Sequence, residues 1–231
     1  MNYHLEDIVD TGNFVSRERF LSCARPSSVR VPVKKLYFGI DWASKRDNTW
    51  AVVGNELNDM ADMLKLPNVP YAEQIQLLND WLRTPRVEVA EDGTEIEYTY
   101  EERILAAKGD STGEGDMPME ILATDTRLPI DSSSHVKFSM QSKDKMYRIV
   151  EVAIYKDEGD PLRFSYPADY PLASEFEEQF CALVREYKGE GECLSVHHPD
   201  DDPSARDDAP DATALALFAR DDGQIGELLV A

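Results

Sequence analysis

Three groups of aspartates lie where the predicted secondary structure changes, and their chemistry is that of a hard metal site. Asp41 ends one short apolar segment and Asp110 ends another. Asp208 and Asp211 lie one helical turn apart at the start of the last predicted helix, directly after Asp207. Clustered carboxylates repel one another unless cations neutralise them. Oxygen ligands favour Mg²⁺ or Mn²⁺, and two such ions can promote hydrolysis of a phosphodiester.

The surrounding pattern predicts the elements that would bring these acids together. Strands are expected at 36–40 and 49–53 as an antiparallel hairpin, and at 103–107 before Asp110. Strands that alternate with helices after an opening hairpin predict an α/β fold, a mixed sheet flanked by helices. Carboxylates at the ends of neighbouring strands can then converge. Further strands are predicted at 135–139, 163–166 and 194–196, and helices at 15–21, 71–83, 117–124, 142–156, 174–187 and from 208 onward.

Each acidic group also has a purely structural interpretation. Asp41 is compatible with a simple turn after a strand, and the glycines at 109–115 with a strand-to-helix turn. Asp208 is a good helix N-cap, and Asp211 is favoured near the positive end of the helix dipole. The three groups together, at these positions, favour a metal site over coincidence.

Composition narrows the class of protein. The chain has 231 residues, 42% hydrophobic and 30% charged, with a formal net charge of −21. No apolar run is long enough to span a bilayer. The three cysteines have no zinc-binding spacing, and we interpret them as reduced thiols of an intracellular protein. Such acidity argues against binding a polyanion unless a local basic patch serves the site, or unless the acidity is an adaptation to surroundings such as high salt.

The three acidic motifs resemble those of a known family. YFGIDWAS at 37–44, followed by DNTWAV at 47–52, resembles the first nuclease motif of phage terminase large subunits. GDSTGEGD at 109–116 resembles their second motif, and DDAPDATALA at 207–216 resembles their third. The order and spacing of the motifs cover the chain from Leu36 to Phe218.

The resemblance implies a ribonuclease-H-like fold that cuts concatemeric viral DNA by two-metal hydrolysis, with little sequence specificity. By motif, the catalytic ligands of two Mg²⁺ or Mn²⁺ ions fall on Asp41, Asp110 and Asp208, with Asp211 as an extra ligand. Asp47 and Asp116 match recurrent acids of the same motifs. Where many relatives have His before the aspartate pair, this chain has Arg206. His197 is interpreted either as part of a polar loop or as an accessory residue at the rim of the site.

The same resemblance divides the chain into parts. Residues 1–33 are expected to be a lead-in from a missing ATPase domain, and 34–231 the nuclease domain, with a probable hairpin insertion at 86–100. No phosphate-binding GxxxxGK[ST] motif occurs in the sequence. The expected partners are double-stranded DNA, the ATPase domain, the small terminase subunit and the portal, in the host cell cytoplasm and without a membrane. The candidates for contacts with DNA phosphates are Lys108, Lys137, Lys143, Lys145 and Arg148, and a plain solvated surface is the alternative interpretation of the lysines.

Three alternatives stay open at this point. Another ribonuclease-H-like nuclease, such as a Holliday-junction resolvase, would share the acids but prefer branched DNA. A non-catalytic acidic module would use its charge to mimic DNA or to dock on a basic partner. A domain that binds metal but holds DNA too weakly without its ATPase half would show little activity alone.

Overall fold

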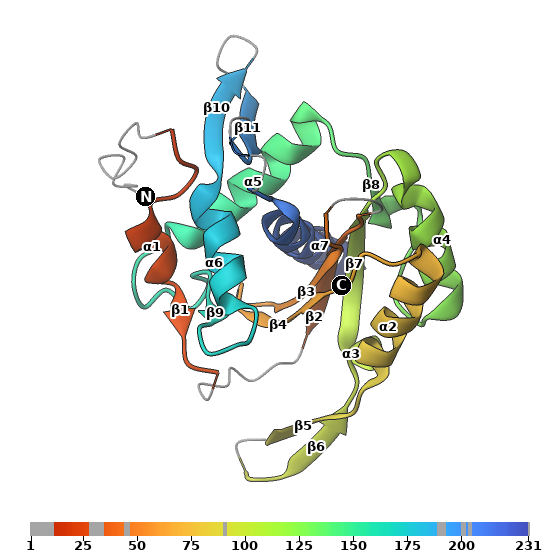
Figure 1. Ribbon diagram of the computed structural model, residues 1–231. Helices are drawn as coiled ribbons and strands as arrows, with labels where there is room; N and C mark the ends of the chain where they lie inside the picture. The colour runs from red at the N-terminus through yellow and green to blue at the C-terminus, as the bar shows by residue number, and fades with distance from the viewer. Residues whose placement is uncertain are drawn as a thin grey trace.

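A five-stranded mixed sheet organises the computed structural model, which describes residues 12–27, 35–43, 47–89, 92–188, 193–199, 202 and 205–230. The strand order is β4-β3-β2-β7-β8 (Figure 1). β2 pairs antiparallel with β3 and β3 with β4, whereas β2, β7 and β8 are parallel. The predicted α/β fold and the opening hairpin are therefore confirmed. The strands are β2 (Leu36–Asp41), β3 (Trp50–Asn55), β4 (Met60–Lys65), β7 (Ile104–Asp110) and β8 (His135–Val136).

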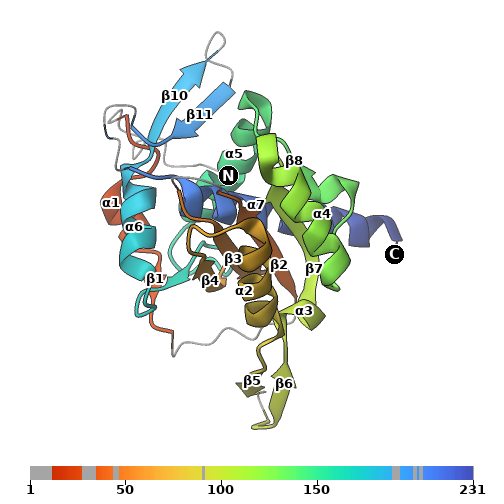
Figure 2. The same cartoon turned by 45° about the vertical axis from the view of Figure 1, so that its right-hand side comes forward.

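Helices cover both faces of this sheet (Figures 1 and 2). α7 (Asp208–Val230) lies across β2, β3 and β7, with α5 (Met140–Ile154) beside it. α2 (Tyr71–Arg83) and α4 (Asp116–Asp125) pack together on the other face. Alternate residues of β3 enter the two cores: Trp50 and Val52 face the α7 side, and Ala51 and Val53 face the α2 side.

Gly39 explains how closely α7 approaches the sheet. A Cβ atom at this position would lie 2.1 Å from the carbonyl oxygen of Ala212 and 2.3 Å from the backbone nitrogen of Ala216. Only glycine leaves room for the helix backbone here. Along the same face of β2, Tyr37 lies near Gly223. The helix therefore runs antiparallel to β2, and its first turn lies toward the end of the strand that carries Asp41.

Smaller elements surround this frame. The protruding hairpin β5–β6 lies at the start of β7, and the hairpin β10–β11 lies at the other end of the molecule (Figure 1). The short strands β1 and β9 pair in parallel. These elements are α1 (Arg17–Leu21), β1 (Ala24–Arg25), β5 (Arg86–Val89), β6 (Glu95–Tyr98), α3 (Tyr100–Arg103), η2 (Gly113–Gly115), η3 (Ser132–Ser134), β9 (Tyr166–Pro167), α6 (Ala173–Ala182), β10 (Val184–Lys188) and β11 (Cys193–His197).

The segment before residue 34 packs against the body of the protein where it is described. Ser16 caps α1, which forms within the helix predicted at 15–21, and the Ser16 side chain accepts a hydrogen bond from the backbone of Arg19. Phe14, Val15 and Phe20 are buried in the core on the α7 side. Residues 28–34 lie outside the described part of the chain, and the boundary at 33 stays a prediction.

Two predicted helices have different bounds in the structure, and one strand was not predicted. The helix expected at 174–187 ends at Ala182, and Val184–Lys188 instead forms β10, because it pairs with β11. The helix expected at 142–156 covers Met140–Ile154, since Ser139 caps it and Ser142 is the third residue of a capping box. β4 was missed because MADMLK lacks β-branched residues, although pairing with β3 makes it a strand.

No helix in the described part of the chain combines the length and apolar character needed to cross a membrane.

Candidate metal centre

The alternation of strand residues aims Asp41 and Asp110 at the same place. Asp41 shares the face of β2 with Gly39, so it is directed toward α7. Ile40 lies beside Gly109 in the parallel pairing of β2 and β7, so the aspartates that follow them end adjacent strands. A Cβ at Gly109 would meet Met119 of α4, and Asp110 therefore points to the opposite face, the one that α7 covers.

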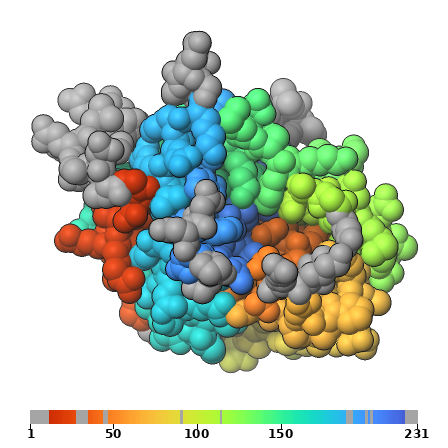
Figure 3. Space-filling view, turned by 45° about the horizontal axis from the view of Figure 1, so that its top comes forward, coloured from red at the N-terminus to blue at the C-terminus, as the bar shows by residue number. Residues whose placement is uncertain are grey.

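The first turn of α7 supplies the remaining acids. Asp208 and Asp211 lie three residues apart on one helical face and are only 7% and 3% exposed. Figure 3 looks onto this side of the molecule, where the blue C-terminal segment lies between the orange first strands and the green segments around α5. The structure thus brings Asp41, Asp110, Asp208 and Asp211 together, as the three motifs predicted.

The electrostatics show how strongly these carboxylates interact. Burial, together with the charges of Asp211, Asp208 and Asp110, holds the pKa of Asp41 well above its ordinary value. Burial raises the pKa of Asp110 as well, although two hydrogen bonds from Thr112 oppose the shift. Four acids that disfavour each other's charge form a site that a cation would stabilise.

Asp208 carries the clearest sign of a missing partner. Its Oδ2 is buried and has no hydrogen-bond partner in the described structure, while the backbone of Asn48 donates to the carboxylate. Burial and the charges of Asp47, Asp207 and Asp211 raise the pKa of Asp208 to about 7. A buried carboxylate oxygen without a donor costs free energy, and a divalent cation would satisfy it.

Two side chains of α5 hold Asp211. The Lys143 Nζ lies 2.7 Å from Asp211 Oδ2, and the Tyr147 hydroxyl donates a 2.6 Å hydrogen bond to Asp211 Oδ1. Burial raises the pKa of Asp211 to about 6, although Lys143 opposes the shift. Burial disfavours the charge of Lys143, but Asp211 and Asp207 outweigh it and raise the pKa of the ammonium. Lys143 therefore stays protonated and lies within the acidic cluster.

The donors fit Mg²⁺ or Mn²⁺ in their chemistry, since all are carboxylate oxygens. Within the described residues, no group of three Asp, Glu, His or Cys side chains lies close enough together to ligate a single metal ion. To ligate a metal ion, the aspartate side chains would have to rotate and the Lys143 ammonium would have to move away.

The accessory acids lie at the rim of this cluster. Asp47 binds Arg206, with 2.7 Å between Arg206 Nε and Asp47 Oδ1, so the arginine before the aspartate pair forms an ion pair at the rim. Asp116 lies 3.3 Å from His135 Nδ1, and this histidine holds the pKa of the Asp116 carboxyl below its usual value. His135 was not among the predicted site residues.

Of the two interpretations of His197, the contacts in the structure do not support an accessory role at the rim of the site. His197 does not contact the acids of the cluster: its Nδ1 lies 2.7 Å from the carbonyl oxygen of His198, and its Nε2 lies 3.7 Å from Glu186. His198 instead approaches the site, with its Nδ1 3.2 Å from Asp207 Oδ1. His197 ends β11 and His198 begins the loop that follows, and the sequence alone does not indicate which of the two side chains approaches the acidic cluster.

The basic residues also separate into two groups. Lys108 is only 4% exposed, and its ammonium binds the carbonyl of Ser133 and Asp222, so we do not carry it forward as a DNA contact. Lys145 and Lys137 have side chains that are 61% and 73% exposed, and Arg148 is partly exposed beside Asp144. Of these exposed cations, Lys137 lies nearest to the rim acids, since its ammonium is 3.5 Å from Asp116 Oδ2.

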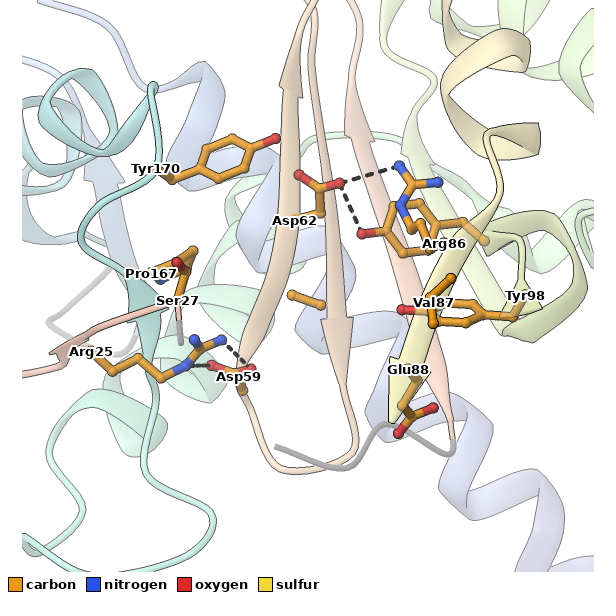
Figure 4. A pocket seen from close by; sticks show the side chains of 12 residues that line it. Arg25, Ser27, Asp59, Asp62, Arg86, Val87, Glu88, Tyr98, Pro167 and Tyr170 are labelled. Atoms are coloured by element: carbon orange, nitrogen blue, oxygen red, sulfur yellow. Dashed lines mark hydrogen bonds and ion pairs between the residues drawn. The ribbon is translucent and has the colours of Figure 1, made fainter. Parts of the chain in front are cut away.

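A cavity of about 460 Å³ lies elsewhere, along the edge of β4 (Figure 4). Its charged groups bind one another: Arg25 pairs with Asp59, and Asp62 accepts from Tyr100 and Arg86. This satisfied network does not resemble the repelling cluster at Asp41.

The pKa shifts predict a specific pH dependence. Because the folded-state pKa values of Asp208 and Asp211 lie above their unfolded values, the folded protein binds more protons, and metal-free stability should fall as pH rises from about 4 to 7. The melting temperature measured in EDTA should fall over this pH range, and saturating Mn²⁺ should make the melting temperature depend less on pH. Asp208→Asn should also flatten it; an unchanged slope in that variant would contradict the assignment.

Comparison with known proteins supports the fold. No protein-family model matches the chain, and no curated protein matches it in sequence. Among solved structures, the large terminase nuclease of thermophilic phage G20c with bound magnesium matches with a TM-score of 0.55 and 13% identity, covering 81% of this chain and 82% of that one. A mutant nuclease domain of the large terminase subunit gp2 of bacterial virus Sf6, with manganese and beta-thujaplicinol, matches with a TM-score of 0.60 and 8% identity, covering 90% and 98%.

The HK97 bacteriophage large terminase matches with a TM-score of 0.55 and 14% identity, and covers 90% of this chain but only 43% of that longer one. These identities are low, so the likeness concerns the arrangement of the backbone. The chain has the ribonuclease-H-like fold of phage large terminase nuclease domains.

Proposed function

We propose that this protein is a metal-dependent DNA endonuclease of the phage terminase type. The observation that carries the proposal is the cluster of Asp41 with the buried Asp110, Asp208 and Asp211, whose charges disfavour one another and whose Asp208 Oδ2 has no donor in the described structure. The fold shared with terminase nuclease domains, two of them with magnesium or manganese bound, supports it.

In this proposal Asp41, Asp110 and Asp208 hold two Mg²⁺ or Mn²⁺ ions. Bound ions of this kind lower the pKa of water and stabilise charge on phosphate oxygens. The protein positions these acids. The parallel strands β2 and β7 place Asp41 and Asp110 side by side, and α7, which packs closely against Gly39, carries Asp208. Thr112 fixes the orientation of Asp110 with two hydrogen bonds to its Oδ1.

DNA would approach along the exposed cations near the start of α5. Lys137, Lys145 and Arg148 are exposed, and each is paired with one aspartate, Asp116, Asp222 and Asp144 respectively, which a DNA phosphate would have to replace. Contacts to phosphates position a duplex without reading its sequence. Cutting of concatemeric viral DNA, together with an ATPase domain, a small subunit and a portal, remains the role that the resemblance implies.

Lys145→Glu tests this DNA surface. The substitution should weaken DNA binding and reduce the slope of log affinity against log salt concentration by about one unit, because one phosphate contact is lost. Fluorescence anisotropy with a labelled duplex in Ca²⁺ or EDTA would measure it. Lys156→Glu, just beyond the far end of α5, is the matched control; equal loss in both variants would mean a general charge effect instead.

Substrate comparison tests the nuclease itself. The protein should cut supercoiled and linear duplex DNA in Mn²⁺ or Mg²⁺, and EDTA should stop the reaction. A strong preference for a four-way junction over linear duplex would favour a resolvase. Absence of cleavage on every substrate, across a wide range of salt and protein concentration, would favour a non-catalytic acidic module.

A further inference from the structure

Tyr147 is a buried polar group that the proposed chemistry does not use. Its side chain is fully buried in the core on the α7 side, and its ring packs edge-on against Phe14 with centroids 5.3 Å apart. The hydroxyl nevertheless reaches Asp211, at 2.6 Å from Oδ1. A tyrosine locked by packing has one donor, and here that donor is aimed at an acid of the cluster.

The spacing of residues on α5 allows a second side chain to bind the same carboxylate. Lys143 and Tyr147 are four residues apart, so they lie on one face of the helix and reach the same carboxylate. Lys143 donates a hydrogen bond to Asp211 Oδ2 and Tyr147 donates one to Asp211 Oδ1, so both oxygens are bound and the plane of the carboxylate is fixed. The two donors differ in mobility: the tyrosine is enclosed by core residues, whereas the lysine is a flexible chain.

Asp211 is also the acid whose charge affects Asp41 most strongly. Among the neighbouring charges that raise the pKa of Asp41, that of Asp211 is the largest. The position of Asp211 therefore contributes, with Asp208 and Asp110, to the electrostatic environment of Asp41. Each carboxylate oxygen has a second lone pair, so Asp211 can keep its bond to Tyr147 and still face a cation.

We propose that Tyr147 is a positioning residue that orients Asp211 for divalent metal binding, an inference that rests on the proposed function. In this role the hydroxyl keeps one oxygen of Asp211 fixed while the Lys143 ammonium yields its place to the metal. Partners that orient metal ligands in this way typically contribute about tenfold to a hundredfold to metal affinity or activity. Tyr147 does not touch the reacting atoms.

The test is Mn²⁺ binding to the purified protein without DNA, measured by calorimetry. Tyr147→Phe keeps the ring and its packing and removes only the hydroxyl. We expect the Mn²⁺ dissociation constant to rise by about tenfold or more, and the Mn²⁺ concentration for half-maximal cleavage to rise in parallel, with the KM for DNA unchanged.

Tyr166→Phe is the matched control, because the buried Tyr166 hydroxyl donates a 2.9 Å hydrogen bond to Glu177, in the aromatic core beside α6. This variant should bind Mn²⁺ like the wild type. If Tyr147→Phe also binds like the wild type, or if both variants weaken binding equally, the positioning role is overturned.

A double-mutant cycle keeps the test decisive if Tyr147→Phe is poorly stable. In an Asp211→Ala background, removing the Tyr147 hydroxyl should have no further effect on Mn²⁺ affinity. Additive losses would contradict a role through Asp211. Failure of the wild type itself to bind Mn²⁺ would instead contradict the metal centre of the proposed function, and the inference would fall with it.

Discussion

Replacing Asp41 with asparagine should abolish metal-dependent cleavage. Asp41 ends β2 at the point where Asp110, Asp208 and Asp211 all affect its charge, so it is the central member of the cluster. Changing a residue that only supports a ligand costs about tenfold to a hundredfold, so loss of a central ligand should lower the cleavage rate by more than about a hundredfold. Nicking of supercoiled plasmid in Mn²⁺ is the measurement.

The same substitution should leave the fold intact and stabilise it without metal. Asparagine removes one of four mutually repelling charges, so the melting temperature in EDTA should rise at neutral pH. The exposed Asp125→Asn, at the end of α4, is the control and should change neither property. An Asp41→Asn protein that cuts DNA at the wild-type rate would remove Asp41 from the site.

Gly39→Ala should cause the largest loss of stability among conservative substitutions in the sheet. The new methyl group would lie 2.1 Å from the Ala212 carbonyl oxygen and 2.3 Å from the Ala216 nitrogen, and backbone atoms of a packed helix cannot rotate away. Overpacking of this kind costs about 1–3 kcal/mol, and sometimes more. Urea denaturation should show the lower free energy of unfolding, and cleavage should fall because α7 carries Asp208 and Asp211.

Gly54→Ala is the appropriate comparison for that variant. Its Cβ would meet chiefly the flexible end of the Met60 side chain, at 2.8 Å from Cε, which can move aside. This variant should retain nearly all of its stability and activity. Equal destabilisation by the two alanines would mean that close packing of α7 on β2 is not what sets the position of the last two acids.

The main elements of the fold were predictable because their signals are local. β2 and β3 are short apolar runs around a turn, and α2 buries Ile75, Leu78 and Leu82 on one face as its spacing predicted. The last helix was expected from Asp208 onward and begins there, with Asp207 rather than Asp208 at the N-cap position. By contrast, β4 and β10 are strands because of the strands they pair with, and no local pattern carries that information.

The acids of the site were predictable, but the groups that control them were not. Strand ends and a helix start placed four aspartates, since alternation and helical spacing decide where they point. Lys143 was expected to face DNA, yet it lies against Asp211, and Tyr147 was not identified at all. Both contacts join α5 to α7 across more than sixty residues of sequence, so only the tertiary packing reveals them.

The most direct test of the central claim is cleavage of supercoiled plasmid by wild-type protein that has first been stripped of metal with EDTA. Adding back Mn²⁺ or Mg²⁺ should convert the plasmid to nicked and linear forms, at a rate that rises with the metal and saturates. Cleavage that persists at full rate in excess EDTA, or that is absent in every divalent metal at high protein concentration, would contradict the assignment of this acidic cluster as a metal-dependent nuclease centre.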